Sequence, residues 1–165
     1  FFFPKPEHKV ILITSSLSGE GKTFTSLNIA TVLAVSGKKV ALVGADLRKP
    51  KIYLDMNVRN VEGLSNYLAN KTTAEKIILQ TPIENLSFIP SGFIPPNPAE
   101  LLALPKMNDF MKYLRENFDY IILDTPPIGL VTDAFSLIKY SDLNVYIIRH
   151  NYTQTKFLKD LNEMI

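Results

Sequence analysis

The 165-residue chain contains no cysteine, which excludes disulfide bonds and thiolate metal sites. It has no apolar run of the roughly 18 residues that a membrane-spanning helix needs, and no secretory signal peptide is visible. The net charge is only +2 and the basic residues are scattered, so the charge gives no reason to expect a nucleic-acid partner. These absences leave the class of ordinary globular domains, which at this length bury roughly 70% of the surface of the unfolded chain.

Apolar, strand-like runs alternate with helical patterns along the whole chain. This alternation predicts an α/β fold, a mostly parallel sheet with helices on both faces. Ligands of such sheets bind beyond the carboxyl ends of the strands. We expect strands over residues 9–14, 39–43, 86–90, 120–124 and 143–149, and helices over residues 22–36 (capped by Gly37), 63–70, 73–80, 98–104, 106–117, 132–139 and 153–165.

Residues 14–23 (TSSLSGEGKT) connect the first predicted strand to the first predicted helix. That setting is typical of a phosphate-binding loop, or Walker A motif, whose backbone N–H groups point at anionic oxygens. Lys22 would reach the β- and γ-phosphates of a nucleoside triphosphate, and the Thr23 hydroxyl would hold Mg²⁺. Ser16 stands where the usual pattern has glycine or alanine, and a glycine-rich turn is the structural alternative. The predicted nucleotide-binding residues are Ser18, Gly19, Glu20, Gly21, Lys22, Thr23 and Phe24.

Two aspartates follow later strands, at the edge of the sheet where this loop lies. Asp46 could bind Mg²⁺ directly or through water, or it could cap a helix; Arg48 could bind phosphate or pin the loop to Asp46. Asp124 closes an apolar strand, which is the Walker B position, although a turn-forming role is the alternative. A buried carboxylate there needs a metal or Thr23 as a partner. The pattern predicts Lys22, Asp46 and Asp124 as catalytic residues and Thr23, Asp46 and Asp124 as the metal site.

Four separated blocks occur in the order found in the bacterial tyrosine kinases, and together they resemble that family. They are SSLSGEGKT (15–23), ADLRKP (45–50), PSGFIPPNPAELL (90–102) and DYIILDTPPIGLVTDA (119–134). The family comprises the cytoplasmic kinase domains of capsular and exopolysaccharide assembly proteins, and the resemblance covers nearly the whole chain. It implies ATP- and Mg²⁺-dependent phosphorylation of protein tyrosines. Lys22 and Thr23 match Walker A, Asp46 matches the second aspartate of Walker A′, and Asp124 matches Walker B.

The resemblance also implies a cellular setting. Family members form rings, phosphorylate a tyrosine cluster in the tail of a neighbouring subunit and regulate polysaccharide export. We therefore expect residues 1–165 to be a single P-loop kinase domain, a fragment of a longer membrane-anchored chain, at the cytoplasmic face of the bacterial inner membrane. The expected partners are other copies of the protein, the tyrosine-rich tail of a neighbour and the polysaccharide export machinery, with no nucleic acid.

Three departures from the family pattern bear on these expectations. Gly44 replaces the first aspartate of the D-x-D form of Walker A′, which is a candidate for orienting or deprotonating the incoming phenol. The seven tyrosines are dispersed rather than clustered. The glutamate–arginine motif that builds the ring would lie upstream of Phe1.

These departures keep an alternative open, a nucleotide-dependent assembly switch that cycles nucleotide without phosphorylating tyrosine. A partitioning-type ATPase is a further option, but Leu17 stands where those proteins carry a lysine that crosses the dimer interface. Residues 149–152, after the last predicted strand, are candidates for adenine contacts, and an ordinary strand-to-helix turn is their structural alternative.

Overall fold

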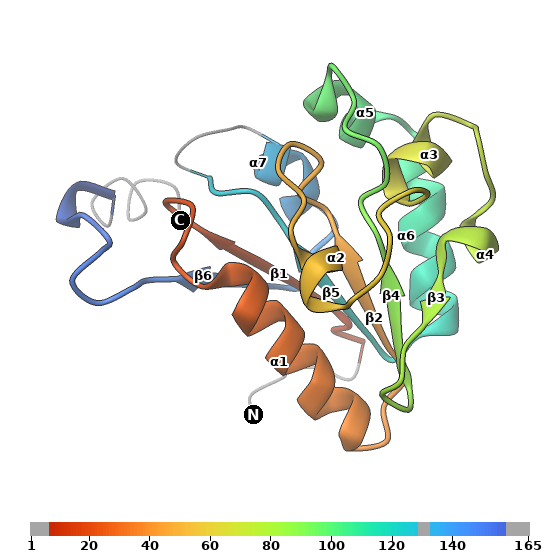
Figure 1. Ribbon diagram of the computed structural model, residues 1–165, viewed down its shortest axis with the longest axis horizontal. Helices are drawn as coiled ribbons and strands as arrows, with labels where there is room; N and C mark the ends of the chain where they lie inside the picture. Colours follow the sequence, from red (N-terminus) through yellow and green to blue (C-terminus); the bar gives the residue numbers. More distant parts are fainter. Residues whose placement is uncertain (1–6, 129–132, 158–165) are drawn as a thin grey trace.

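A six-stranded sheet forms the centre of the computed structural model, which describes residues 7–128 and 133–157 (Figure 1). The strand order is β3-β4-β2-β5-β1-β6, and every neighbouring pair is parallel except β3 and β4. The predicted α/β fold with a mostly parallel sheet is therefore confirmed. The strands are β1 (Val10–Ser15), β2 (Val40–Gly44), β3 (Leu79–Gln80), β4 (Leu86–Ile89), β5 (Tyr120–Asp124) and β6 (Leu143–Ile147).

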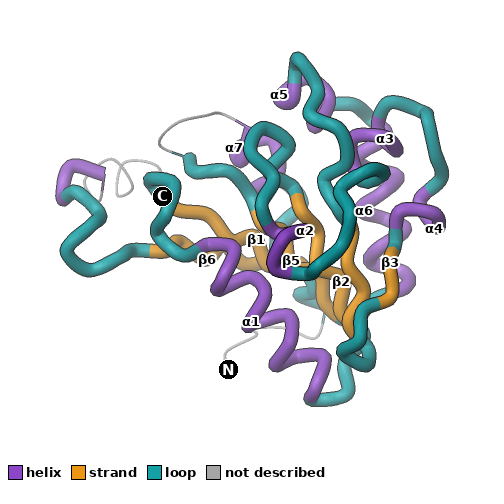
Figure 2. Tube along the Cα trace, viewed as in Figure 1, coloured by secondary structure: helices purple, strands orange, loops and turns teal. Residues whose placement is uncertain are grey.

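Helices cover both faces of the sheet, as Figure 2 shows. Alternate residues of a strand point to opposite faces. Ile11 and Ile13 of β1 belong to the core cluster that includes residues of α1 and α2, whereas Leu12 belongs to the cluster that includes residues of α3 to α7. The helices are α1 (Lys22–Val35), α2 (Ile52–Asp55), α3 (Leu64–Leu68), α4 (Ala74–Ile77), α5 (Pro98–Ala103), α6 (Lys106–Asn117) and α7 (Asp133–Ile138). No helix in the described ranges is both long enough and apolar enough to cross a bilayer.

The long helix α1 ends as the sequence predicts. Gly37 has a positive φ of 85°, a conformation that glycine adopts without steric cost. Its N–H donates to the carbonyl of Ala34, and the N–H of Lys38 donates to that of Leu33. These bonds satisfy carbonyls that the end of a helix would otherwise leave unpaired.

The helix predicted over residues 73–80 is wrong beyond Ile77. α4 is a single turn, Ile78 is extended, and Leu79 of β3 pairs antiparallel with Phe88 of β4. A single turn gains little from helical hydrogen bonds, whereas the open edge of β4 offers backbone groups that need partners.

Smaller differences concern element ends and placement. The four-residue helix α2 was not predicted, and β6 ends at Ile147 rather than at residue 149. The structure begins α7 at Asp133, while Thr132 and residues 158–165 of the last predicted helix lie outside the described residues.

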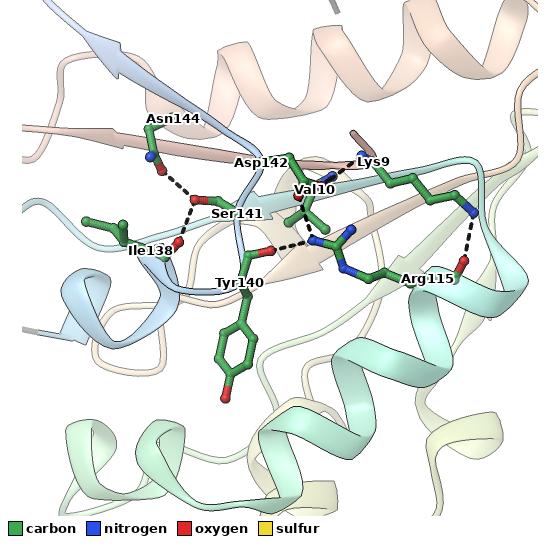
Figure 3. A network of polar contacts seen from close by, with 8 residues as sticks. All are labelled: Lys9, Val10, Arg115, Ile138, Tyr140, Ser141, Asp142 and Asn144. Carbon is green, nitrogen blue, oxygen red and sulfur yellow. Dashed lines mark hydrogen bonds and ion pairs between the residues drawn. The ribbon is translucent and has the colours of Figure 1, made fainter. Parts of the chain in front are cut away.

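A polar network ties the amino edge of the sheet together, at the start of β1 and β6 (Figure 3). The Asp142 carboxylate accepts hydrogen bonds from the backbone N–H of Lys9 (2.9 Å) and of Val10 (2.8 Å), and from Arg115 Nη2 (3.0 Å). Arg115 also donates to the carbonyl of Tyr140 at 2.8 Å. Because Arg115 lies on α6, the network fastens a helix and two strands at the edge opposite the predicted site.

Candidate nucleotide-binding site

The strand register brings the predicted site residues to one edge of the sheet. Asp124, the last residue of β5, lies level with Ile13 of β1 on one side and with Gly44 of β2 on the other. The loops that follow β1 and β2 therefore leave the sheet on either side of Asp124. Between them lies a cleft of about 380 Å³, which is lined by Ser18, Gly19, Gly21, Lys22, Thr23, Phe24, Asp46, Arg48, Lys49, Lys51, Asp124, Pro126 and Pro127.

Asp124 is the buried acid of this cleft, with 4% of its surface exposed. Its two carboxylate oxygens accept hydrogen bonds from the hydroxyls of Thr23 and Ser26, both at 3.0 Å. Burial raises the pKa of Asp124 to about 6, although the two hydroxyls and the charge of Lys22 favour the ionised form. The partnership with Thr23 that the sequence predicts is present.

Lys22 is almost as buried, and its Nζ donates to Ser15 Oγ at 3.1 Å. Burial lowers the pKa of Lys22, and the carboxylates of Asp124, Asp46 and Glu20 partly offset that effect. The Ser15 hydroxyl in turn donates to the carbonyl of Leu17 at 2.7 Å. The lysine is thus held against the end of β1, at the base of the phosphate-binding loop.

Asp46 lies across the cleft in the loop after β2. Its Oδ1 accepts hydrogen bonds from the backbone N–H of Arg48 (3.1 Å) and Lys49 (2.9 Å), so the side chain holds a turn in that loop. It does not cap a helix, because α2 begins only at Ile52. Arg48, Lys49 and Lys51 make this wall of the cleft basic, which favours an anionic ligand.

The phosphate-binding loop, residues 16–21, has the backbone shape that its glycines allow. Gly19 and Gly21 have φ values of 89° and 102°. Six of the seven predicted nucleotide-binding residues line the cleft; the exception is Glu20. The Glu20 carboxylate is buried, accepts the backbone N–H of Leu17 at 2.6 Å and accepts the hydroxyl of Thr153.

The outer side of this loop contacts β6 and the segment after it. Ser16 Oγ shares a hydrogen bond with the Tyr146 hydroxyl, which gives the departure from glycine at this position a structural partner. Arg149 Nη1 donates to the carbonyl of Gly19 at 2.8 Å, and the Tyr152 hydroxyl donates to that of Ser18 at 2.9 Å. Arg149 and Tyr152, considered for adenine contacts, are absent from the lining of the cleft.

Sequence reasoning missed Ser26 and the basic residues Lys49 and Lys51. Ser26 follows Thr23 by three residues on α1, a spacing that places both hydroxyls on one helix face, so it could have been found. The contacts of Tyr146, Arg149 and Tyr152 could not, because they depend on the pairing of β6 with β1.

Gly44, the departure in Walker A′, is closely packed. A Cβ atom at this position would lie 2.8 Å from Ser91 Oγ and 3.1 Å from Cγ2 of Ile52. The Ser91 hydroxyl donates to the Gly44 carbonyl at 2.8 Å. The space beside Gly44 is therefore occupied by a buried serine rather than left open.

The mostly parallel sheet, the loop that opens α1 and the pairing of Thr23 with Asp124 define the class of P-loop NTPases. The AAA domain family matches residues 8–165. Tyrosine-protein kinase CpsD of Streptococcus agalactiae is 38% identical over 158 residues, covering 92% of this chain and 69% of that protein. The kinase domain of Escherichia coli tyrosine kinase ETK has a TM-score of 0.92 at 31% identity, covering 97% of this chain and 63% of that one. The chain belongs to the AAA domain family and, within it, to the bacterial tyrosine kinases of capsule biosynthesis.

A more distant relative shares the fold. The septum site-determining protein MinD of Pyrococcus horikoshii, solved as a complex with Mg-ADP, has a TM-score of 0.77 at 25% identity, covering 95% of this chain and 66% of that one. Some kinase relatives are far longer than the region compared. Tyrosine-protein kinase ptk of Acinetobacter johnsonii is 35% identical over 96% of this chain, which spans 22% of that protein.

Proposed function

We propose that this chain is the catalytic domain of an ATP- and Mg²⁺-dependent protein-tyrosine kinase, which autophosphorylates and regulates the assembly and export of capsular polysaccharide or exopolysaccharide. One observation carries the proposal. The Thr23 hydroxyl and the Asp124 carboxylate are hydrogen-bonded in a cleft that Lys22 and Asp46 also line. Phosphoryl transfer depends chiefly on positioning and on electrostatic stabilisation, which such a cleft provides.

The groups in the cleft fit the two cofactors. Residues 18–24 would bind the triphosphate of ATP, through backbone N–H groups and the Lys22 ammonium. Thr23, Asp46 and Asp124 would hold Mg²⁺, which prefers oxygen ligands and keeps several waters and phosphate oxygens of its own. A cation beside Asp124 would also offset the unfavourable burial of its charge, which raises its pKa to about 6. Bound Mg²⁺ would neutralise charge on the phosphate oxygens during transfer.

Lys22 and the basic loop after β2 have separate tasks. Burial lowers the pKa of Lys22, but the carboxylates of Asp124, Asp46 and Glu20 favour its charged form, which suits contact with the transferring phosphoryl group. Arg48, Lys49 and Lys51 line the opposite wall and would attract the anionic substrate. Asp46 would hold the turn that carries these basic residues, and it would act in catalysis together with Lys22 and Asp124.

The tyrosine acceptor and the partners are proposed from the resemblance to the family. A phenol has a pKa of about 10, so its proton must leave as the oxygen attacks the γ-phosphorus. We assign the acceptor to the tyrosine-rich tail of a neighbouring copy in a ring-like oligomer, which acts with the polysaccharide export machinery. We place the domain in a longer membrane-anchored protein, at the cytoplasmic face of the bacterial inner membrane. Relatives that are named tyrosine-protein kinases support the choice of tyrosine as the acceptor.

The test uses the protein in its full natural length, incubated with ATP and Mg²⁺ and examined for phosphotyrosine by mass spectrometry. We expect labelled tyrosine in the wild type and none in Lys22→Met, which removes the ammonium from the loop. Lys112→Met, on the exposed side of α6, is the matched control and should label normally. Nucleotide binding without any labelled tyrosine in the wild type would overturn the kinase proposal.

The alternative is a nucleotide-dependent assembly switch, and Gly44 is the observation that favours it. The position of the first Walker A′ aspartate carries no carboxylate, and Ser91 fills the space where a side chain would begin. A switch would bind nucleotide and change its assembly without transferring phosphate to tyrosine. The same experiment separates the two functions when nucleotide-dependent oligomerisation is followed by light scattering alongside phosphotyrosine.

A further inference from the structure

A second set of contacts holds the phosphate-binding loop from outside the cleft. Four residues of β6 and the segment after it contact the loop: Tyr146, Arg149, Tyr152 and Thr153. Their hydrogen bonds go to four of the five residues from Ser16 to Glu20, namely Ser16, Ser18, Gly19 and Glu20. Both segments lie at the β6 end of the sheet in Figure 1. We call these four residues the clasp. We propose that the clasp positions the phosphate-binding loop for nucleotide, an inference that rests on the nucleotide site of the proposed function.

The geometry of the peptide bond gives the clasp its effect. In a trans peptide the C=O and the following N–H point to opposite sides. Tyr152 holds the carbonyl of Ser18, so the N–H of Gly19 is directed to the other side of that peptide. Arg149 holds the carbonyl of Gly19 and in the same way directs the N–H of Glu20. The clasp therefore turns two successive N–H donors away from itself, on a loop that lines the cleft.

A loop with glycines at positive φ has many conformations to lose. Ordering one residue costs about 1–2 kcal/mol, and glycine loses more freedom than any other residue. A loop that is already held when nucleotide arrives does not lose this freedom on binding, so affinity rises. The φ of 89° favours glycine at position 19, and a Cβ atom there would lie 3.1 Å from the Tyr152 hydroxyl oxygen, so Tyr152 lies close against the loop at this residue.

The remaining contacts link the clasp internally and to the loop. The Thr153 hydroxyl accepts the backbone N–H of Arg149 at 2.9 Å and donates to the buried carboxylate of Glu20. Glu20 in turn accepts the N–H of Leu17, at the start of the loop. The Arg149 guanidinium lies 5.0 Å from the centre of the Tyr152 ring, so the two donors also support each other. Arg149, Thr153, Glu20 and Leu17 are thus joined by one connected set of hydrogen bonds.

The first test is Tyr152→Phe in the full natural protein, which removes one hydroxyl and keeps the ring. We expect the Kd for MgADP, measured by calorimetry, to rise about three- to tenfold, the effect of losing one hydrogen bond. Tyr140→Phe is the matched control, because its hydroxyl donates to Asn108 on the exposed surface away from the cleft. The control should leave the Kd unchanged. Equal Kd values for the wild type, Tyr152→Phe and Tyr140→Phe would overturn the proposal.

A second pair of variants separates positioning from simple stability. Arg149→Ala should raise the KM for ATP, or the Kd for MgADP, by about tenfold, and Arg149→Lys should recover part of the loss because it keeps a donor. Tyr152 is 46% exposed, so Tyr152→Phe should leave the melting temperature nearly unchanged. A fall in melting temperature that fully accounts for the weaker binding would assign these residues a structural role only.

The binding measurement also keeps this proposal distinct from the kinase proposal. If MgADP binds and the clasp variants weaken it while no tyrosine is ever labelled, the clasp stands and the kinase function falls. If tyrosine is labelled in the wild type but the variants bind nucleotide normally, the clasp falls and the kinase function stands.

Discussion

Two aspartates at opposite ends of the strands have opposite electrostatic environments. The amino edge and the carboxyl edge are the sides of the sheet at which the parallel strands begin and end. Asp142, at the amino edge, has a pKa below its ordinary value: burial acts to raise it, but hydrogen bonds from Arg115, Val10 and Lys9 outweigh burial. Asp124, at the carboxyl edge, has a pKa raised to about 6, chiefly by burial. The fold therefore stabilises the charge of one acid and penalises the charge of the other.

The difference lies in the donors that surround each carboxylate. Asp142 faces two backbone N–H groups and a guanidinium, which together favour its charge (Figure 3). The hydrogen-bond partners of Asp124 are the two hydroxyls of Thr23 and Ser26. We infer that the first acid serves stability, whereas the second is held ready for a cation that would offset its buried charge.

The largest expected effect is on the free energy of unfolding when Asp142 is replaced. Asp142→Asn should lower the free energy of unfolding by about 2–4 kcal/mol, because an amide cannot accept from all three donors and the Arg115 charge loses its partner. The Kd for MgADP should stay near the wild-type value, measured well below the melting temperature. Asp55→Asn, at an exposed position, is the control and should change stability by less than about 0.5 kcal/mol. A stable Asp142→Asn protein with weakened nucleotide binding would reverse the roles assigned to the two edges.

Asp124→Asn should have the opposite effect on stability. A pKa raised from 3.8 to about 6 corresponds to an upper bound of roughly 3 kcal/mol lost by burying the charge at neutral pH. The neutral amide avoids that loss, and one of the hydroxyls of Thr23 and Ser26 can donate to its oxygen while the other accepts from its N–H group. We expect urea unfolding to show a gain of about 1–3 kcal/mol together with loss of phosphotyrosine. A destabilised variant would mean that the charge is already compensated in the folded protein.

The pH dependence sharpens the same comparison. Because the folded pKa of Asp124 is the raised one, the folded state binds more protons between about pH 4 and pH 6, and wild-type stability falls as pH rises through that window. The difference in unfolding free energy between Asp124→Asn and the wild type should grow over this window and level off above it. The contribution of Asp142 has the opposite sign: it is present above the ordinary pKa of 3.8 and is lost as pH falls through the lower folded value.

The sequence predicts the two strand-end acids of the cleft better than their surroundings. Lys22, Thr23 and Asp124 could be placed because a strand, a short loop and a helix fix their local geometry, and parallel strands share a carboxyl edge. The contacts of Arg115 with Asp142 could not be placed. They bring α6 next to the start of β6, which depends on the order of the strands in the sheet, and local sequence patterns do not reveal that order. The helix expected over residues 73–80 failed for the same reason, since an edge strand is chosen by its partner.

The smallest expected effect is at Gly44. An aspartate introduced there would add a third acid to the comparison of Asp124 with Asp142. Gly44→Ala should cost about 1 kcal/mol, because its Cβ displaces Ser91 Oγ from the Gly44 carbonyl. Gly44→Asp introduces the same Cβ contacts and places a carboxylate level with Asp124, so it should move the pH step of Asp124 upward. The alanine variant is the control for the steric part. Turnover should rise in Gly44→Asp over Gly44→Ala if the missing carboxylate limits proton removal from the phenol. Equal turnover would mean that another group receives this proton. The site would then need no acid besides Asp46 and Asp124 for phosphoryl transfer.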